Sequence, residues 1–468
     1  MARAPAAIPP KVISSRTTPV CGAGAASASH PPPHTSTLLL LASHSIATAA
    51  DPPMSDRFIS PNQPSVPSSE FLLESPPRRP RTSTALLLLL LLASFVAGTL
   101  SATYSVIDYG AKGDGITNDT QAFQNAWSAV CFNSTEPSIM LVPAGKVYLL
   151  GLAKFRGPCK YYVDGNLKRV DEVWPPHENN WLLFIQIDGI TVAGAGQIDG
   201  QGASWWACKE AKTCPFLAAN SLVLLGVTRA QVFGLSFINS AMMHVAVGES
   251  AGVRISNLNI TAPAESPNTD GIHVERSRHV IITDCQISTG DDCISVSSGA
   301  LDVNISRIRC GPGHGLSIGS LGIEKSYATA EGIHVSNSTI FQTDNGVRIK
   351  TWQGGSGFAR DISFTNINFR DVKNPIIIDQ FYCPRGGCQN DTSAVQVSGV
   401  KFVGVKGSST SDMAISLECS QISGCHDVTM EDVDIWHAGP GEQAQAFCFN
   451  AHGTKAKVVK PDVPCLSF

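Results

Sequence analysis

The sequence predicts an all-β fold, a single parallel β-helix with a short capping helix near its N-terminal end. Three observations support this prediction. Short runs of alternating apolar and polar residues recur along the chain, Gly, Asn and Ser fill the turns between them, and only one segment has a helical pattern. The composition agrees, because 43% hydrophobic residues, 15% charged residues and 41 glycines in 468 residues suit a β-rich extracellular protein.

The first hundred residues are expected to lie outside this fold. Residues 1–84 are rich in Ala, Pro, Ser and Thr without periodicity, so they are predicted to be a disordered or processed extension. Residues 85–103 are predicted to be the hydrophobic region and cleavage zone of a signal peptide, because a basic stretch (78–81) precedes an apolar run (85–98). The run is too short for a good membrane span, although a signal-anchor is the alternative.

The predicted signal peptide begins far from the first residue. Met54 is therefore a more natural start than Met1, and the sequence leaves the true start and the cleavage site open. The folded domain is predicted to span residues 104–468.

The folded region contains one helix candidate followed by strand candidates. The helix candidate, residues 118–130, is predicted to cap the open end of the solenoid. Stacked strand–turn units place equivalent strands parallel, about 4.8 Å apart. A β-sandwich is the alternative, but the two-residue hairpin turns that it needs are scarce. The strand candidates are residues 253–260, 279–287, 301–308, 333–340, 361–369 and 426–435.

Fourteen cysteines indicate an oxidising compartment. No pair has the histidine spacing of a zinc site, so a structural metal is disfavoured. Cys285 lies in an apolar run and is predicted to be a buried free thiol. The remaining folded-region cysteines are interpreted as disulfides between Cys208 and Cys214, Cys293 and Cys310, Cys383 and Cys388, Cys419 and Cys425, Cys448 and Cys465, and, more loosely, Cys131 and Cys159.

Charge and sequons also limit the function. A net charge of -4 argues against a general nucleic-acid binder but allows an acidic substrate in a local cationic cleft. Six glycosylation sequons fit a secreted glycoprotein, at Asn118, Asn133, Asn259, Asn304, Asn337 and Asn390.

Four polar clusters recur at about the length of one coil, so they are expected to lie on successive rungs of one face. Three aspartates on adjacent rungs repel one another and should raise at least one pKa, as acid–base cleavage of a glycosidic bond requires. Asp291 and Asp292 can both serve only if the strand bends, and Gly290 is expected to allow that bend. The clusters are Asn268-Thr269-Asp270, Gly290-Asp291-Asp292, Gly313-His314-Gly315 and Arg348-Ile349-Lys350.

Taken alone, an Asp-Asp pair is usually a solvated turn or a cation site, Gly-His-Gly is usually a turn, and Arg-x-Lys on an exposed strand face usually serves only solubility. Calcium binding remains the main rival, because clustered aspartates on a parallel β-helix are also typical of pectate lyases, which use calcium and an arginine base. Arg348 and Lys350 project together and either neutralise the aspartates in a structural ion network or bind a sugar carboxylate. A uronic acid polymer would fit the second interpretation.

The four clusters, in this order, resemble the signature of the polygalacturonases, family 28 of the glycoside hydrolases. The resemblance extends from about Tyr104 to Phe468, and matches to the plant branch occur at residues 106–115, 157–160 and 198–202. It implies a right-handed parallel β-helix and inverting hydrolysis of α-1,4-linked galacturonan, the backbone of pectin, without a metal or other cofactor.

The resemblance also implies roles for individual residues. Asp291 would be the general acid, and Asp270 and Asp292 would hold and deprotonate the attacking water. His314 would tune the protonation of the acid. Substrate binding would fall to Asn268, Arg348, Lys350 and Tyr382. His244 and His273 are interpreted as structural residues without a catalytic role.

The expected protein is a secreted monomer of the extracellular space and cell wall that acts on pectin or polygalacturonate, with no nucleic-acid partner and no stable membrane span. The alternatives are another pectin-backbone hydrolase, namely an exo-galacturonase or a rhamnogalacturonan hydrolase, or a non-catalytic pectin-binding wall protein. The sequence leaves open endo or exo action, tolerance of methyl esters, which sequons are glycosylated, and the tissue role.

Overall fold

The computed structural model describes residues 38–42, 102–135, 137–159, 180–214, 218–384, 386–388 and 390–467. The predicted signal region up to residue 101 and most of the predicted N-terminal extension lie outside the described residues. The described residues belong to the compact unit that runs from Ser36 to Phe468. No helix among the described residues is long and apolar enough to cross a membrane.

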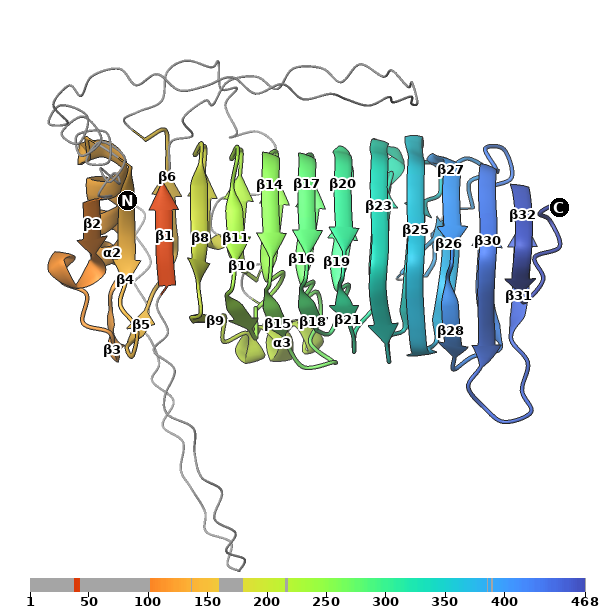
Figure 1. The fold of residues 1–468 in the computed structure, drawn as a ribbon, viewed down its shortest axis with the longest axis horizontal. Helices are drawn as coiled ribbons and strands as arrows, with labels where there is room; N and C mark the ends of the chain where they lie inside the picture. The colour runs from red at the N-terminus through yellow and green to blue at the C-terminus, as the bar shows by residue number, and fades with distance from the viewer. Residues whose placement is uncertain are drawn as a thin grey trace, which may run out of the picture. The chain divides into compact units, whose positions relative to one another are not determined.

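The predicted all-β solenoid is confirmed as a right-handed parallel β-helix with two long sheets (Figure 1). Within the described residues, the sheet that we call the short sheet has 11 strands, and all of its pairings are parallel. In spatial order its strands are β6 (Ala153–Arg156), β7 (Asn180–Ile185), β10 (Asn220–Leu225), β13 (Val245–Gly248), β16 (Ile272–Glu275), β19 (Ile294–Val296), β22 (Leu316–Leu321), β24 (Asn345–Trp352), β26 (Asn374–Tyr382), β29 (Met413–Glu418) and β31 (Gln445–Phe449).

The second sheet, which we call the long sheet, has 19 strands in the described residues. It contains all six of the strand runs that were expected from the sequence. Its strands are β1 (Leu38–Ala42), β2 (Ala102–Ser105), β4 (Ser138–Val142), β8 (Ile190–Gly194), β9 (Gln197–Asp199), β11 (Gln231–Phe233), β12 (Ser236–Ile238), β14 (Ala251–Ser256), β15 (Asn259–Thr261), β17 (Arg278–Thr283), β18 (Gln286–Ser288), β20 (Ala300–Ser306), β21 (Arg309–Cys310), β23 (Tyr327–Phe341), β25 (Ser356–Val372), β27 (Gln396–Val403), β28 (Lys406–Ser409), β30 (Cys425–His437) and β32 (Ala451–Lys460).

Strand β1 is the exception to the parallel order. It lies within the predicted extension and pairs antiparallel with β4 and β8, whereas the rest of residues 1–84 lies outside the described residues. The first strand of the domain, β2, begins at Ala102. A small separate sheet joins β3 (Asp114–Asn118) to β5 (Val147–Leu149).

Alternation of side chains explains why these segments are strands of a closed coil. In β16, Ile272 and Val274 are fully buried, whereas His273 and Glu275 are partly exposed on the outer face. Ile272 pairs with Val245 on one side and Ile294 on the other, so apolar residues form continuous columns inside the solenoid. The outer columns remain available for polar side chains.

The predicted capping helix is confirmed near the start of the domain. Helix α2 (Thr120–Ser128) continues into a short π-helical segment, η2 (Ala129–Asn133). Trp127 is buried, donates from Nε1 to the carbonyl oxygen of Arg156 at 3.0 Å, and packs edge-on against Phe155 and Phe184. These contacts place the helix over the first coils of the core.

A second helix, α3 (Ala203–Glu210), was not predicted. None of its residues is buried, so the sequence carries no amphipathic signal for it. It is fastened instead by the Cys208–Cys214 disulfide and by Trp206, whose Nε1 donates to the Ser240 carbonyl oxygen at 3.1 Å. The other short helical segments are η1 (Val106–Tyr109) and η5 (Ile323–Lys325).

All six predicted disulfides are present, and Cys285 is a buried free thiol as predicted. The pairs are local in sequence, with separations of 5, 6, 6, 17, 17 and 28 residues. The bond between Cys293 and Cys310 is the one closest to the polar clusters, since Cys293 directly follows Asp292.

Candidate active site

The four predicted polar clusters converge on the outer face of the short sheet. Asp270 lies just before β16, the Asp291–Asp292 pair just before β19, and His314 just before β22. Arg348 and Lys350 lie on β24 itself. Because these four strands are successive neighbours in the sheet, residues up to 80 positions apart in the chain lie within four successive rungs.

The turn before β19 presents both consecutive aspartates to the site. We expected the strand to bend at Gly290 so that both aspartates could serve. That expectation was wrong, because Asp291 and Asp292 lie in the turn before the strand. Gly290 is required by close approach: a Cβ there would lie 2.2 Å from the carbonyl oxygen of Ser266. The Gly290 N–H also donates to Oγ1 of Thr269 at 3.1 Å, which ties the two aspartate-bearing turns together.

Asp292 is the most deeply buried of the three aspartates, with 1% of the residue exposed. Its Oδ2 accepts from Lys350 Nζ at 2.8 Å, and its Oδ1 accepts from Arg348 Nη2 at 3.2 Å and from Ser317 Oγ at 2.7 Å. Two cations and a hydroxyl therefore compensate one buried carboxylate. Of the two interpretations of Arg348 and Lys350, these contacts are the ones expected for an ion network with the aspartates.

Asp291 forms a pair with His314. Its Oδ1 lies 3.1 Å from His314 Nδ1, and its Oδ2 accepts from Asn268 Nδ2 at 3.3 Å. Burial opposes the charge of Asp291, but the His314 bond and charge, the Asp292 N–H and Lys350 outweigh it and lower the pKa of Asp291 to about 2. The hydrogen bond to Asp291 in turn raises the pKa of His314.

Asp270 has the opposite electrostatic environment. Burial, followed by the charges of Asp291 and Asp292, raises the pKa of Asp270 to about 7. Its Oδ2 accepts from Ser295 Oγ at 2.6 Å. The expected repulsion within the trio therefore raises the pKa of Asp270, whereas the pKa of Asp291, the residue expected to be the general acid, is lowered beside His314.

Tyr382 lies at the end of β26, one rung beyond Lys350. Its ring centroid is 5.5 Å from Lys350 Nζ and 5.4 Å from the ring of Trp352, which it meets edge-on. The ring is partly exposed, so it forms the edge of the site next to the two cations.

Sequence reasoning missed the two serines that bind the aspartates, and it set His273 aside. His273 pairs in register with Ser295, Ser295 with Ser317, and Ser317 with Arg348, so these four residues form one outer column of the short sheet. The 22-residue spacing of the first three was visible in the sequence and could have identified them.

The oxygen and nitrogen atoms of the clustered acidic and histidine side chains are poorly suited to bind a metal ion. Ligand atoms of Asp291, Asp292 and His314 lie within 4.8 Å of one another. However, both oxygens of Asp292 already accept hydrogen bonds from Lys350, Arg348 or Ser317. A divalent cation would have to displace these cations or face their charge.

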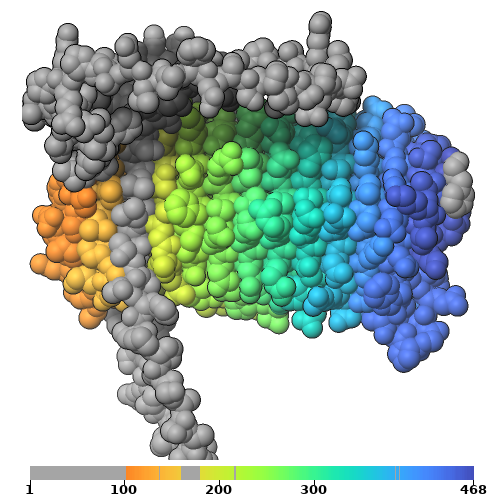
Figure 2. All heavy atoms as spheres, viewed as in Figure 1, coloured from red at the N-terminus to blue at the C-terminus, as the bar shows by residue number. Residues whose placement is uncertain are grey.

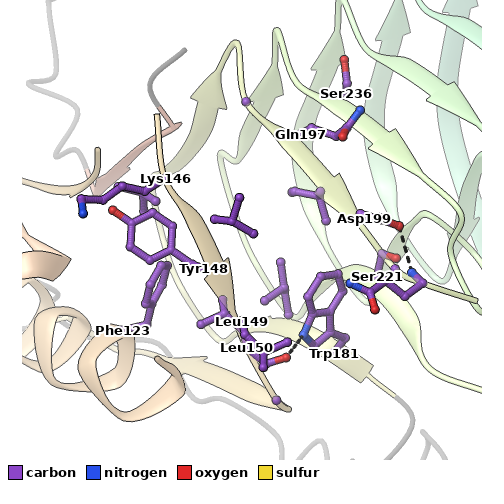
Figure 3. Close-up of a pocket in the computed structure, with 18 of the residues that line it drawn as sticks. Phe123, Lys146, Tyr148, Leu149, Leu150, Trp181, Gln197, Asp199, Ser221 and Ser236 are labelled. Atoms are coloured by element: carbon purple, nitrogen blue, oxygen red, sulfur yellow. Dashed lines mark hydrogen bonds between the residues drawn. The ribbon is translucent and has the colours of Figure 1, made fainter. Parts of the chain in front are cut away.

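A separate cavity of about 1250 Å³ lies between β5 and β9, toward the N-terminal coils (Figure 3). Its lining includes Phe123, Tyr148 and Trp181, and Trp181 Nε1 donates to the Leu150 carbonyl oxygen at 3.1 Å. None of the four polar clusters lines this cavity. The cavity is therefore distinct from the candidate active site.

Comparison with known proteins gives a consistent family. The model described as Glycosyl hydrolases family 28 matches residues 131–458, and one described as Rhamnogalacturonase A/epimerase, pectate lyase-like, matches residues 103–151. A probable polygalacturonase from Arabidopsis thaliana is 41% identical over 371 residues, covering 77% of this chain and 83% of the relative. Polygalacturonase-2 from Solanum lycopersicum is 40% identical, covering 76% of this chain and 80% of the relative.

A solved structure shares the fold at much lower sequence identity. The exopolygalacturonase from Thermotoga maritima superposes with a TM-score of 0.58 at 18% identity, over 72% of this chain and 87% of that chain. This similarity supports the β-helix architecture described above.

Proposed function

Because this chain belongs to the glycosyl hydrolases family 28, we propose that it is a polygalacturonase that hydrolyses α-1,4 bonds of galacturonan. The observation that carries the proposal is the outer face of the short sheet, where three aspartates, a histidine and two cations meet. This combination supplies carboxyl groups for acid–base chemistry and positive charge for an acidic sugar.

The proposed proton donor is the Asp291–His314 pair. The transferable proton can lie on His314 beside an ionised Asp291, or on Asp291 beside a neutral His314. Both states of the pair contain the same proton. As the bond between the anomeric carbon and the glycosidic oxygen breaks, Asp291 Oδ delivers this proton to the leaving oxygen. His314 thereby keeps a transferable proton on the pair, although the pKa of Asp291 alone is low.

Asp270 and Asp292 are the proposed partners of the attacking water. The water oxygen forms the new bond to the anomeric carbon, and its proton passes to one of these two carboxylates. Attack on the face opposite the leaving group gives inversion, the stereochemistry that we propose. Lys350, Arg348 and Ser317 fix Asp292 in place, so only small reorganisation is needed during the reaction.

Arg348, Lys350 and Tyr382 are proposed to bind the galacturonate carboxylate and ring. Lys350 Nζ lies between the Asp292 carboxylate and the Tyr382 ring, and Arg348 lies one pleat earlier on the same strand face. A substrate carboxylate placed there meets two cations that are only partly compensated by Asp292. Asn268 is proposed to orient Asp291 and to contact the sugar from the opposite side.

Secretion to the cell wall as a monomer is also proposed, with the mature domain beginning near residue 104. Six disulfides within the described residues support an oxidising destination. All six sequon asparagines are exposed, as glycan attachment requires. Sequencing the N-terminus of the exported protein and measuring its mass in solution test these points.

The activity is tested with the exported chain and polygalacturonic acid. New reducing ends should accumulate, and Asp291→Asn, which keeps the shape of the side chain but cannot donate the proton, should lower kcat by about 10²-fold or more. Absence of reducing ends with the wild-type protein would favour a non-catalytic wall protein. Simultaneous viscosity measurements separate endo from exo action.

A further inference from the structure

We propose that His273 and Ser295 are positioning residues that favour the charged form of Asp270, which accepts a proton from the attacking water, against the burial and the neighbouring carboxylates that disfavour it. This inference rests on the proposed hydrolase function. It assigns a role to two residues that the catalytic roles above do not use. The evidence is a chain of side-chain contacts that runs from Asp270 toward the protein surface.

The direction of each hydrogen bond follows from the number of available hydrogens. Ser295 Oγ donates its single hydrogen to Asp270 Oδ2, at 2.6 Å. The contact of 2.8 Å between His273 Nδ1 and Ser295 Oγ must then be an N–H donated by His273. The proton of His273 is therefore fixed on Nδ1, and its dipole points along the chain toward Asp270.

The other ring nitrogen of His273 faces an acidic group. His273 Nε2 lies 3.9 Å from Glu275 Oε2, and Arg276 binds Glu275 Oε1 at 2.6 Å and Glu249 Oε1 at 3.3 Å. The full chain reads Glu275, His273, Ser295, Asp270, with each contact on the outer face of the short sheet.

This series of hydrogen bonds matters because of the charged groups that surround Asp270. The turn before β19 places Asp291 and Asp292 against Asp270, and both raise its pKa. On the β13 side lies His244, whose pKa burial lowers to about 4 and whose Nδ1 contacts the backbone carbonyl oxygen of Asp270 at 3.1 Å. Asp291 and Asp292 disfavour a charged Asp270, and His244 contacts the Asp270 backbone, whereas His273 and Ser295 both lower the pKa of Asp270.

The neighbouring rung repeats the same arrangement with a permanent cation. Ser317 donates to Asp292, and Arg348 Nε donates to Ser317 Oγ at 3.3 Å. His273, Ser295, Ser317 and Arg348 occupy one column in register. Each of these two carboxylates thus accepts from a serine, and that serine is contacted in turn by a nitrogen of His273 or Arg348.

The chain also contains a matched control outside the site. On the long sheet, His334 Nδ1 lies 2.9 Å from Ser363 Oγ, and His334 Nε2 lies 3.8 Å from Asp361. Strands β23 and β25 provide the same histidine–serine register that β16 and β19 provide. No contact joins Ser363 to a carboxylate of the candidate site.

The experiment measures kcat and KM on polygalacturonate from about pH 3 to about pH 8 for the full exported chain. The variants are His273→Gln, His273→Leu, Ser295→Ala and the pair His273→Leu/Ser295→Ala, with His334→Leu and Ser363→Ala as controls. Glutamine keeps a neutral donor, so it separates the hydrogen bond from the charge. Thermal unfolding of each variant separates folding defects from the pH effect.

The expected result is an acid limb of kcat that moves to higher pH by about one unit in His273→Leu and Ser295→Ala, with little change in KM. His273→Gln should move the limb less, the double variant should equal either single variant, and the controls should match wild type. A uniform loss at every pH, additive effects, or an equal response to the controls would overturn the inference. Because the wild-type protein must be active before limbs can be compared, an inactive wild type overturns the proposed function instead.

Discussion

At the scale of single residues, the site is defined by how each buried carboxylate is compensated. Asp292 has two cations and a serine, Asp291 has a histidine and an asparagine, and Asp270 has a serine and a more distant histidine. Burial and the neighbouring carboxylates raise the pKa of Asp270, whereas the His314 bond, with its charge, outweighs burial and lowers the pKa of Asp291. In the proposed mechanism, that difference allows one trio to contain both an acid and a base.

Removal of Lys350 is expected to destabilise the protein. Lys350→Met leaves the buried Asp292 with one cation, which should cost about 3 kcal/mol in the free energy of unfolding. The double variant Lys350→Met/Asp292→Asn should recover most of this stability in urea unfolding but remain inactive. Equal stabilities of wild type and Lys350→Met would show that the pair contributes nothing to the fold.

The alkaline limb of the activity profile is expected to depend on His314. Its pKa is raised by Asp291, so the pair keeps its transferable proton below that raised pKa and loses it as the pH increases through it. In His314→Gln the proton must reside on Asp291 alone, and the limb should move to lower pH. An unmoved limb in the rate–pH profile would exclude His314 from the proton donor.

At the scale of elements, the strand prediction succeeded for the long sheet and missed the short one. The runs expected from the sequence have strict alternation because only one face is buried, as in residues 279–287. The structure divides that run into β17 and β18 at Asp284, whose φ of 58° interrupts the strand. Short-sheet strands such as β19, with only three residues, are too brief to give a periodic signal.

The candidate site could largely be predicted from the sequence, because its clusters recur at coil length and in a recognisable order. The 22-residue recurrence of His273, Ser295 and Ser317 was visible in the sequence, but it does not show which carboxylate each side chain contacts. Their roles depend on hydrogen-bond directions, which require three-dimensional contacts.

The Cys293–Cys310 disulfide is expected to support catalysis as well as stability. It joins the residue after Asp292 to the strand that precedes His314, across a sequence separation of 17. Replacing both cysteines by alanine should cost about 3 kcal/mol and also lower kcat. Cys448–Cys465 has the same separation of 17 at the C-terminal end, so its double alanine variant should lose stability with kcat preserved. Equal kcat losses in the two variants would contradict this view.

At the scale of the whole domain, the length of one coil determines which residues meet at the candidate site. Each turn of about 22 residues between His273, Ser295 and Ser317 returns the chain to the same outer face one rung further on. Figure 2 shows the described residues as successive colour bands from orange to blue, which follow the order of the chain. Residues distant in sequence therefore meet without any long-range folding motif other than the repeat itself.

Stability of the whole domain is expected to depend on pH through Asp270. The folded-state pKa of about 7 lies above the ordinary value of 3.8, so folding favours the protonated form. The contribution of Asp270 is therefore complete at low pH and is lost as the pH rises through about 7. Asp270→Asn should be inactive but should raise the urea midpoint at neutral pH relative to wild type. A lower midpoint at neutral pH would contradict the environment assigned to Asp270.

The central claim, hydrolysis of galacturonan by the aspartate trio, is tested most directly by cleavage of polygalacturonate in ¹⁸O-labelled water with mass spectrometry of the products. The wild-type protein should place one ¹⁸O atom at each new reducing end, and Asp291→Asn should form such labelled ends at least about 10²-fold more slowly. Unsaturated, unlabelled products would instead identify elimination and contradict the hydrolytic mechanism.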